Sequence, residues 1–234
     1  MKIIGLPIFA VLHHLQKDQY YFFGYRIPST EGKPEVIDVP HDLISISEDG
    51  EKIENVISFP IEKFVISKGG HNWSIASIAE LITVPFKDSL AVCHTQNYLI
   101  KIFDLESEKI VRSFRREYQR VKVPKGRCVG AILSIGGKKY SAPREYLNDI
   151  YRLFACDDHL WVMTSTVEKE KGVLVDVFNF EGEYIDNFYI IIPGIDDPIA
   201  IMYTPMTISN GFLFRTVRNE DDTFSIVKYR IEDK

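Results

Sequence analysis

The chain has 234 residues, of which 45% are hydrophobic and 26% are charged, with a net charge of −5. This composition is that of an ordinary globular protein, and it excludes a disordered chain or a long coiled coil. The 15 Phe and 12 Tyr favour β-strands, because aromatic side chains suit half-buried pleated surfaces. No run of about 18 apolar residues occurs, so we predict no membrane-spanning segment.

The first apolar run, residues 3–12, superficially resembles a short signal sequence. Pro7 interrupts it, His13 and His14 follow it, and no small-residue cleavage pattern appears. We therefore expect a first β-strand at 3–12 and no clear signal peptide, which leaves the localisation unknown.

A strand–turn–strand pattern recurs further along the chain, at residues 44–53, 100–110 and 175–185. Glycines in the turns of the first and last copies supply the positive φ that such hairpins often need. Ser107 replaces glycine in the middle copy, so we expect that turn to differ from the others or to be strained.

Other short apolar strands lie before each hairpin, and the innermost ones are expected at 81–84, 151–155 and 199–203. Repeated four-stranded meanders are typical of propeller blades, whereas sandwiches do not repeat at this period. We predict an all-β fold, a single β-propeller domain over residues 1–234 with four-stranded antiparallel blades. About four blades are visible, at about 1–60, 63–115, 150–190 and 196–232.

The last unit ends after its third strand, because the chain closes at Lys234. We predict an incomplete propeller, either a fragment of a six-bladed ring or a chain whose ring is completed by an oligomer or by missing blades. The run at 3–12 is the candidate within the chain for completing the last blade.

Three segments resemble one family of propellers: Asp158-His159-Leu160-Trp161-Val162, the hairpin at 175–182, and residues 114–121. Over about residues 40–232 the chain resembles the bacterial six-bladed β-propeller proteins of the TolB-like and NHL-like group. The resemblance implies six blades, where the sequence displays about four. Many relatives are exported, which implies an extracytoplasmic location if the chain is truncated at its N-terminus.

The connection at 116–149, between the second and third units, is basic. Residues 109–144 hold eleven Lys and Arg against Glu117 alone, so this segment carries +10 and the rest of the chain carries −15 (−5 minus +10). Loops on a rigid scaffold often bind ligands, and arginine suits carboxylates and phosphates. The candidate anion-binding residues are Arg116, Tyr118, Arg120, Lys122, Lys125 and Arg127.

Two further residues, His94 and Asn97, are expected on the same loop face. The alternative for the basic connection is structural: its cations pair with the acidic remainder, and 128–135 forms an extra strand. Nucleic acid is a poor candidate, because the chain as a whole is acidic.

Catalytic and metal-binding motifs are absent from the sequence. There is no Gly-rich phosphate loop, nucleophile elbow or paired-histidine motif, and Cys93, Cys128 and Cys156 have no disulfide or metal spacing. We expect no cofactor and no metal, and the catalytic residues, if any, are unknown. We predict a non-catalytic β-propeller that binds a small molecule or a protein. The alternative is a metal-dependent propeller hydrolase or lactonase, with carboxylates and amides holding the metal at the central channel.

Overall fold

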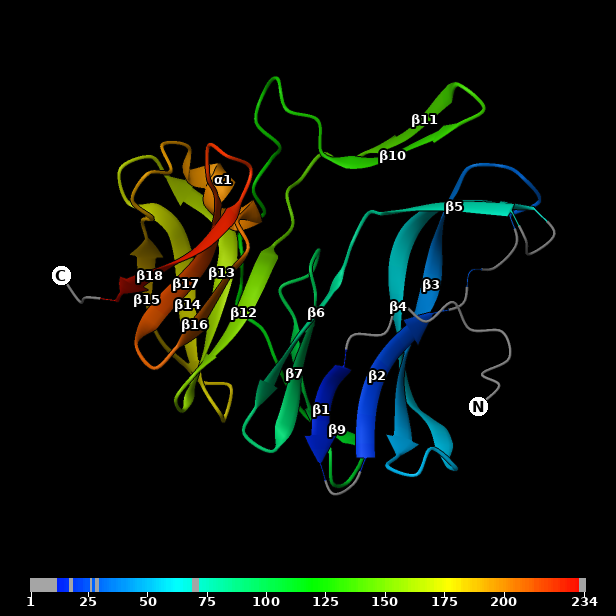
Figure 1. Ribbon diagram of the computed structural model, residues 1–234, viewed down its shortest axis with the longest axis horizontal. Coiled ribbons are helices and arrows are strands. Elements are labelled where there is room, and N and C mark those ends of the chain that lie inside the picture. The colour runs from blue at the N-terminus through cyan, green and yellow to red at the C-terminus, as the bar shows by residue number, and fades with distance from the viewer. Residues whose placement is uncertain (1–11, 17–18, 26, 28–29, 69–71, 232–234) are drawn as a thin grey trace.

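The computed structural model describes residues 12–231, with gaps at 17–18, 26, 28–29 and 69–71. Apart from residue 12, the strand expected at 3–12 lies outside the described residues. The described chain is almost entirely β-structure, arranged in five antiparallel sheets (Figure 1).

Each sheet is a meander, in which strands that follow one another in the chain are neighbours. The first sheet consists of β1 (Leu12–Gln16), β2 (Gln19–Tyr25), β3 (Glu35–Ser47), β4 (Ile53–Lys68) and β5 (Asn72–Ser77). The second consists of β6 (Leu81–Phe86), β7 (Ser89–His94), β8 (Ile100–Asp104) and β9 (Lys109–Phe114). The third consists of β12 (Ile150–Cys156), β13 (His159–Glu168), β14 (Gly172–Asn179) and β15 (Tyr184–Ile190). The last sheet in the chain consists of β16 (Met206–Ser209), β17 (Phe212–Arg218) and β18 (Phe224–Arg230). The fifth sheet is a separate hairpin of β10 (Gly130–Ile135) and β11 (Lys138–Pro143), which comes between the second and third sheets in the chain.

The four larger sheets pack face to face in chain order. One apolar cluster joins the first sheet to the second, a second cluster joins the second sheet to the third, and a third cluster joins the third sheet to the last. The inner strands follow the same order, since β1 contacts β6, β6 contacts β12, and β12 contacts β16. Strands such as β14 are buried over nearly their whole length because both faces of their sheet are covered. Four-stranded antiparallel sheets stacked around their inner strands define a β-propeller, which confirms the predicted fold class.

The first sheet extends further along the chain than expected. β4 runs without a break through residues 60–63, where the first two units were predicted to meet, and β5 still pairs with it. The second blade therefore begins at Leu81. The third blade, from β12 to β15, spans the residues predicted for it.

The prediction of an innermost strand at 199–203 is wrong, because this segment forms the short helix α1 (Pro198–Tyr203). The Asp197 carboxylate accepts a hydrogen bond from the Ile199 amide at 3.0 Å, and Pro198 occupies the first turn. Both are helix-start signals, and here they outweigh the apolar run. The innermost strand of the last sheet is β16 instead.

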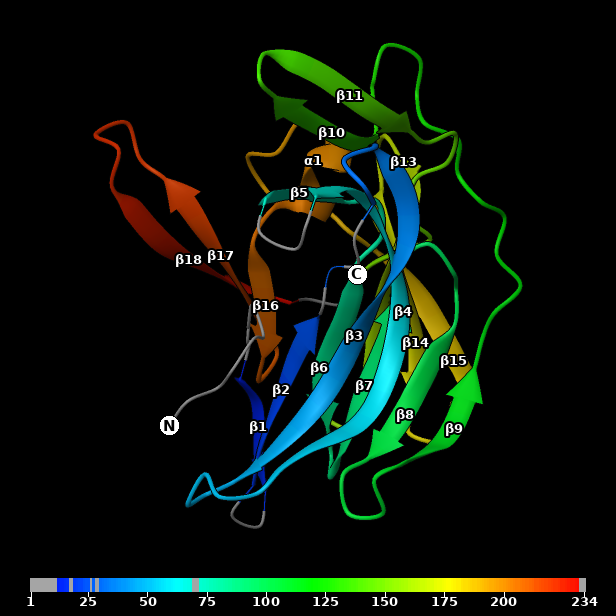
Figure 2. The same cartoon turned by 90° about the vertical axis from the view of Figure 1, so that its right-hand side faces the viewer.

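The last sheet ends at its third strand, as predicted. β18 pairs with β17, and no further strand of the described chain pairs with β18. Figure 2 shows β17 and β18 projecting away from the other sheets.

The middle hairpin copy has a different turn, as its Ser107 predicted. Glu108 takes the left-handed conformation, with a φ of 53°. The Asp104 carboxylate fixes this turn by accepting hydrogen bonds from the Ser107 amide at 2.8 Å and from the Ser107 hydroxyl at 2.5 Å. Glu108 thus takes the positive φ that glycine takes in the other copies.

Gly182 lies in the equivalent turn of the third blade, and we expect Gly182→Ala to destabilise the protein by about 2 kcal/mol. Its φ is +81°, and an added Cβ would lie 2.5 Å from a ring carbon of Phe114. The measurement is urea denaturation, with Gly136→Ala as the control: Gly136 also has positive φ, but a Cβ there meets nothing within 4 Å. Equal losses in the two variants would show that the contact with Phe114 is unimportant.

Candidate functional site

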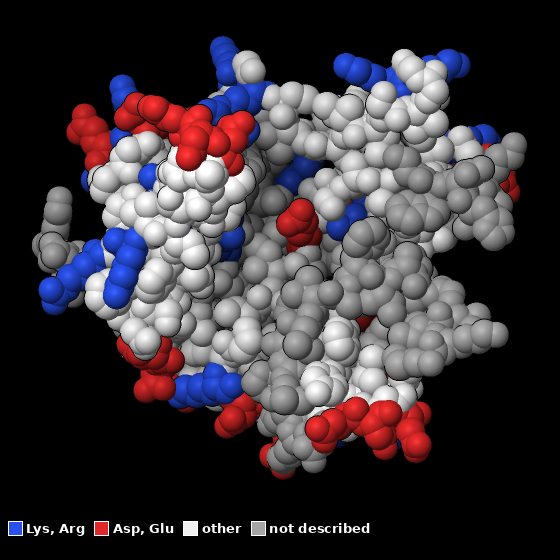
Figure 3. Space-filling view, in the orientation of Figure 1, with Lys and Arg blue, Asp and Glu red and all other residues white. Residues whose placement is uncertain are grey.

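A cleft of about 440 Å³ opens where the inner strands β6, β12 and β16 meet α1. Figure 3 shows the hollow near the middle of the view, with acidic and basic side chains on its walls. Its lining residues are Glu80, Ile82, Thr83, Thr95, Asn148, Tyr151, Arg152, Leu153, Phe154, Met202, Tyr203, Met206 and Thr207. The cleft therefore lies on the side of the blades that faces the propeller channel.

Arg152 is the cation of this cleft. One terminal nitrogen donates a hydrogen bond to the Thr204 carbonyl at 2.9 Å, whereas the buried Nε has no partner among the described residues. Burial lowers the pKa of Arg152, and the Glu80 carboxylate opposes that shift. A partly desolvated guanidinium with an unused donor is well suited to an oxyanion, which would satisfy that donor and the charge together.

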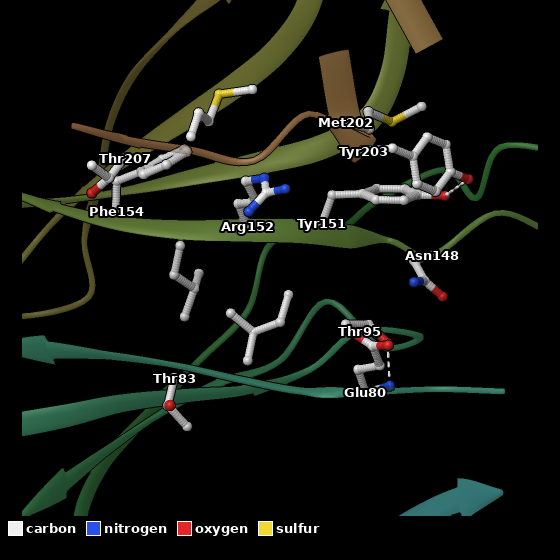
Figure 4. A pocket seen from close by; sticks show the side chains of 13 residues that line it. Glu80, Thr83, Thr95, Asn148, Tyr151, Arg152, Phe154, Met202, Tyr203 and Thr207 are labelled. Carbon is white, nitrogen blue, oxygen red and sulfur yellow. Dashed lines mark hydrogen bonds between the residues drawn. The ribbon is translucent and has the colours of Figure 1, made fainter. Parts of the chain in front are cut away.

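Glu80 and Thr95 lie on the wall opposite Arg152 (Figure 4). The Glu80 amide donates to the Thr95 hydroxyl at 2.9 Å, and the Thr95 amide donates to the Glu80 carbonyl at 3.0 Å. This pair of bonds fixes the backbone of Glu80 and leaves its exposed carboxylate as an acceptor for a ligand hydroxyl or amine.

Two tyrosines form one end of the cleft (Figure 4). Tyr151 and Tyr203 meet edge to face with ring centroids 5.3 Å apart, and their hydroxyls are 3.1 Å apart. Burial raises the pKa of Tyr151, so its hydroxyl is protonated at neutral pH. With Met202 and Met206 they supply an apolar surface beside the charged groups.

The local sequence of β12 places Arg152 in the cleft. Its pairing with β13 shifts register between Ile150 and Arg152. Such an irregularity turns side chains away from strict alternation and is common beside functional sites. Ile150 on one side remains fully buried.

The basic connection contains several of the predicted anion-binding residues, and most of them contact carboxylates of the protein. Arg116 pairs with the buried Asp176 of β14, and Arg127 pairs with Asp197. Another pair joins Arg120 Nε to the Asp149 carboxylate at 3.1 Å.

The remaining predicted cations are exposed. Lys122 lies 3.4 Å from the Glu145 carboxylate, and Lys125 has no ion pair within the described part of the chain. Since four of the five cations face internal carboxylates, an external anion would have to compete with them. Anion binding by this segment stays a prediction.

Tyr118, His94 and Asn97 also make internal contacts. The Tyr118 hydroxyl lies 3.0 Å from the Ser165 hydroxyl and 2.9 Å from that of Thr166. Half-buried His94 accepts a hydrogen bond from the Gln96 amide at 3.3 Å, and burial lowers its pKa. Asn97 is exposed in the turn after β7. None of the three lines the cleft.

Part of the connection is structural, as the alternative interpretation stated. The extra strand predicted at 128–135 is present as β10, paired with β11. Its Ala131 and Leu133 pack against Phe64 of the first sheet. The stretches 121–123 and 145–147 also bond to each other, because the Val123 amide donates to the Glu145 carbonyl at 2.9 Å.

Sequence reasoning missed Arg152, Glu80 and the two cleft tyrosines. One signal was present: Arg152 stands between Tyr151 and the apolar pair Leu153-Phe154 in a strand expected to be innermost. In the structure this charged residue lines the cleft. The net charge of a long connection is a weaker guide to where a ligand binds.

Within the described residues, no three His, Cys, Asp or Glu side chains converge as a metal site requires. In the same part of the chain, no helix has the length and apolarity needed to cross a membrane.

Radially stacked antiparallel sheets with a polar cleft at their inner strands define the class of this protein as a β-propeller. No protein-family model matches the chain, and comparison with curated proteins finds no match. Among solved structures it is similar to the β-propeller domain of the Trilobed protease from Pyrococcus furiosus, described as having an open velcro topology. That similarity has a TM-score of 0.31 and 9% identity, covering 97% of this chain and 83% of the other. The fold assignment rests on the strand order, and membership of the TolB-like and NHL-like group stays a prediction.

Proposed function

We propose that this β-propeller is a binding protein for a small hydroxylated acid, held in the channel cleft through its anionic group. The observation that supports this most directly is Arg152, a half-buried cation whose Nε has no hydrogen-bond partner among the described residues. A buried donor left unsatisfied costs about 1–3 kcal/mol, and a bound carboxylate or phosphate would remove that cost.

The rest of the lining suits the body of such a ligand. Thr83, Asn148 and Thr207 offer hydroxyl and amide groups, and Glu80 offers a carboxylate acceptor on the wall opposite Arg152 (Figure 4). Tyr151 supplies an aromatic surface for the carbon skeleton. A neutral sugar would satisfy the hydrogen-bonding wall but leave Arg152 unpaired, so we expect the acid to bind more tightly.

The expected result of Arg152→Gln is a loss of affinity of about tenfold or more, since hydrogen bonds to charged groups contribute about 1.5–3 kcal/mol. The assay is isothermal titration with glucuronate, glucose and inorganic phosphate at two salt concentrations. Glucuronate is expected to bind more tightly than glucose, and to bind more weakly at high salt.

Arg215→Gln is the matched control. Arg215 also has a buried Nε without a partner in the described chain, but it lies on β17 near Tyr229 and does not line the cleft. The proposal fails if neither glucuronate nor phosphate binds the wild-type protein, or if Arg152→Gln and Arg215→Gln bind them equally well.

A further inference from the structure

The outer edge of β18 lies where the second and third blades carry one more strand. The second and third blades each continue to a fourth strand, β9 and β15, whereas the last sheet ends at β18. A free edge presents a row of backbone donors and acceptors to any strand that can pair with it. Figure 2 shows β18, with β17, on the projecting side of the molecule.

The side chains of β18 favour association at this edge, because two of them are large, apolar and exposed. Ile226 is 76% exposed and Phe224 is 69% exposed, the highest values among the exposed large hydrophobic residues. They lie on one face of the strand together with Lys228 and Arg230, because side chains two residues apart point the same way. The face therefore presents two apolar residues followed by two basic ones.

This order of residues is complementary to itself. We propose that two copies of this chain pair through antiparallel β18 strands, centred on Val227, which joins their two three-stranded sheets into one. In that register all seven residues of the strand are paired. Phe224 faces Arg230 of the second copy, and Ile226 faces Lys228 of the second copy. No two basic residues face each other, so like-charge repulsion across the ladder is avoided.

The same pairing already exists within one chain. In the ladder between β17 and β18, Phe212 pairs with Arg230 and Phe214 pairs with Lys228. The Lys228 ammonium lies 3.6 Å from the centroid of the Phe212 ring, a cation–π contact. In the dimer, Arg230 would lie between an aromatic ring of its own chain and one of the second copy. The interface is isologous, so a single two-fold axis closes it.

Native mass spectrometry and light scattering over a concentration series test this proposal. The wild-type chain is expected to show twice the monomer mass, and Ile226→Lys is expected to weaken self-association by at least about tenfold, since it places two lysines opposite each other. Ile185→Lys is the matched control: Ile185 is a half-exposed isoleucine on β15, which ends a complete blade. That variant is expected to remain dimeric.

Cross-linking tests the register independently. With Cys128, the exposed native thiol, changed to Ser, Val227→Cys is expected to form a disulfide-linked dimer on mild oxidation, because the register places residue 227 beside itself. A mixture of Ser225→Cys and Tyr229→Cys chains is expected to cross-link more than either chain alone.

A monomer at every concentration overturns the proposal, as does a dimer that Ile226→Lys leaves intact or one that Val227→Cys fails to cross-link. If the protein is a monomer and its β18 amides still resist hydrogen exchange, the proposal is also overturned. In that case the partner strand of β18 would come from the N-terminal residues of the same chain. Dimerisation and ligand binding in the cleft fail separately, because Ile226 does not line the cleft.

Discussion

Arg116→Ala is expected to lower the free energy of unfolding by about 3 kcal/mol, because it leaves a buried carboxylate without its counter-ion. Asp176 is fully buried in β14, where it pairs with Arg116 and accepts a hydrogen bond from the Tyr98 hydroxyl at 2.5 Å. Burial raises the pKa of Asp176, and Arg116 and the Tyr98 hydroxyl act against that shift. Without the Arg116 guanidinium, the buried Asp176 carboxylate would be left with neither a counter-ion nor solvent.

Urea denaturation of a double-mutant cycle measures this effect. Asp176→Asn in the Arg116→Ala background is expected to recover part of the lost stability, since the neutral amide tolerates burial better than a carboxylate. The adjacent exposed cation provides a control, and Arg115→Ala is expected to change stability by less than about 0.5 kcal/mol. If Arg116→Ala is as mild as Arg115→Ala, the pair is not structural.

Acidification is expected to destabilise the first sheet through His41. Burial lowers the pKa of this imidazole from 6.5 to about 4, and the Lys63 ammonium acts in the same direction. The folded protein therefore binds a proton at His41 less readily than the unfolded chain does. This contribution to stability is fully present above pH 6.5 and falls between there and about pH 4, a loss of about 3 kcal/mol.

His41→Phe separates this contribution from those of other groups. A phenyl ring retains the stacking on Tyr25, where the rings now lie 4.9 Å apart and 15° from parallel, but it cannot titrate. We expect the variant to lose about 3 kcal/mol less than the wild type between pH 7 and pH 4 in urea titrations. An unchanged dependence on pH would mean that folding does not lower the pKa of His41.

Local signals predicted most of the fold. The hairpin at 175–185 was identified from its turn glycine and apolar strands, and the unit predicted at 150–190 is the third blade. Two predictions of the fold failed, the strand at 199–203 and the blade boundary near residue 60. Asp197 and Pro198 start a helix in a run that apolarity alone assigned to a strand. The boundary near residue 60 was misplaced because β4 is far longer than an average strand of about 5–6 residues.

The cleft was harder to anticipate than the fold. Composition drew attention to the basic connection, where charge was concentrated, but Arg116 and Asp176 are 60 residues apart and their pairing appears only in three dimensions. Glu80, in the connection just before β6, and Arg152, on β12, are likewise far apart in the chain and meet only in the folded protein. The convergence of such groups depends on how blades pack, which no local pattern encodes.

Three apolar clusters of the described residues connect sheets that are consecutive in the chain, and a fourth packs the β10–β11 hairpin on the first sheet. A growing polypeptide could therefore bury each new sheet on one that is already made, without waiting for its far end to be synthesised. Assembly of this kind proceeds from the N-terminus during translation. Because the entropic cost of closing a loop grows only slowly with its length, even the connection at 115–149 adds little to the cost of docking the third sheet on the second.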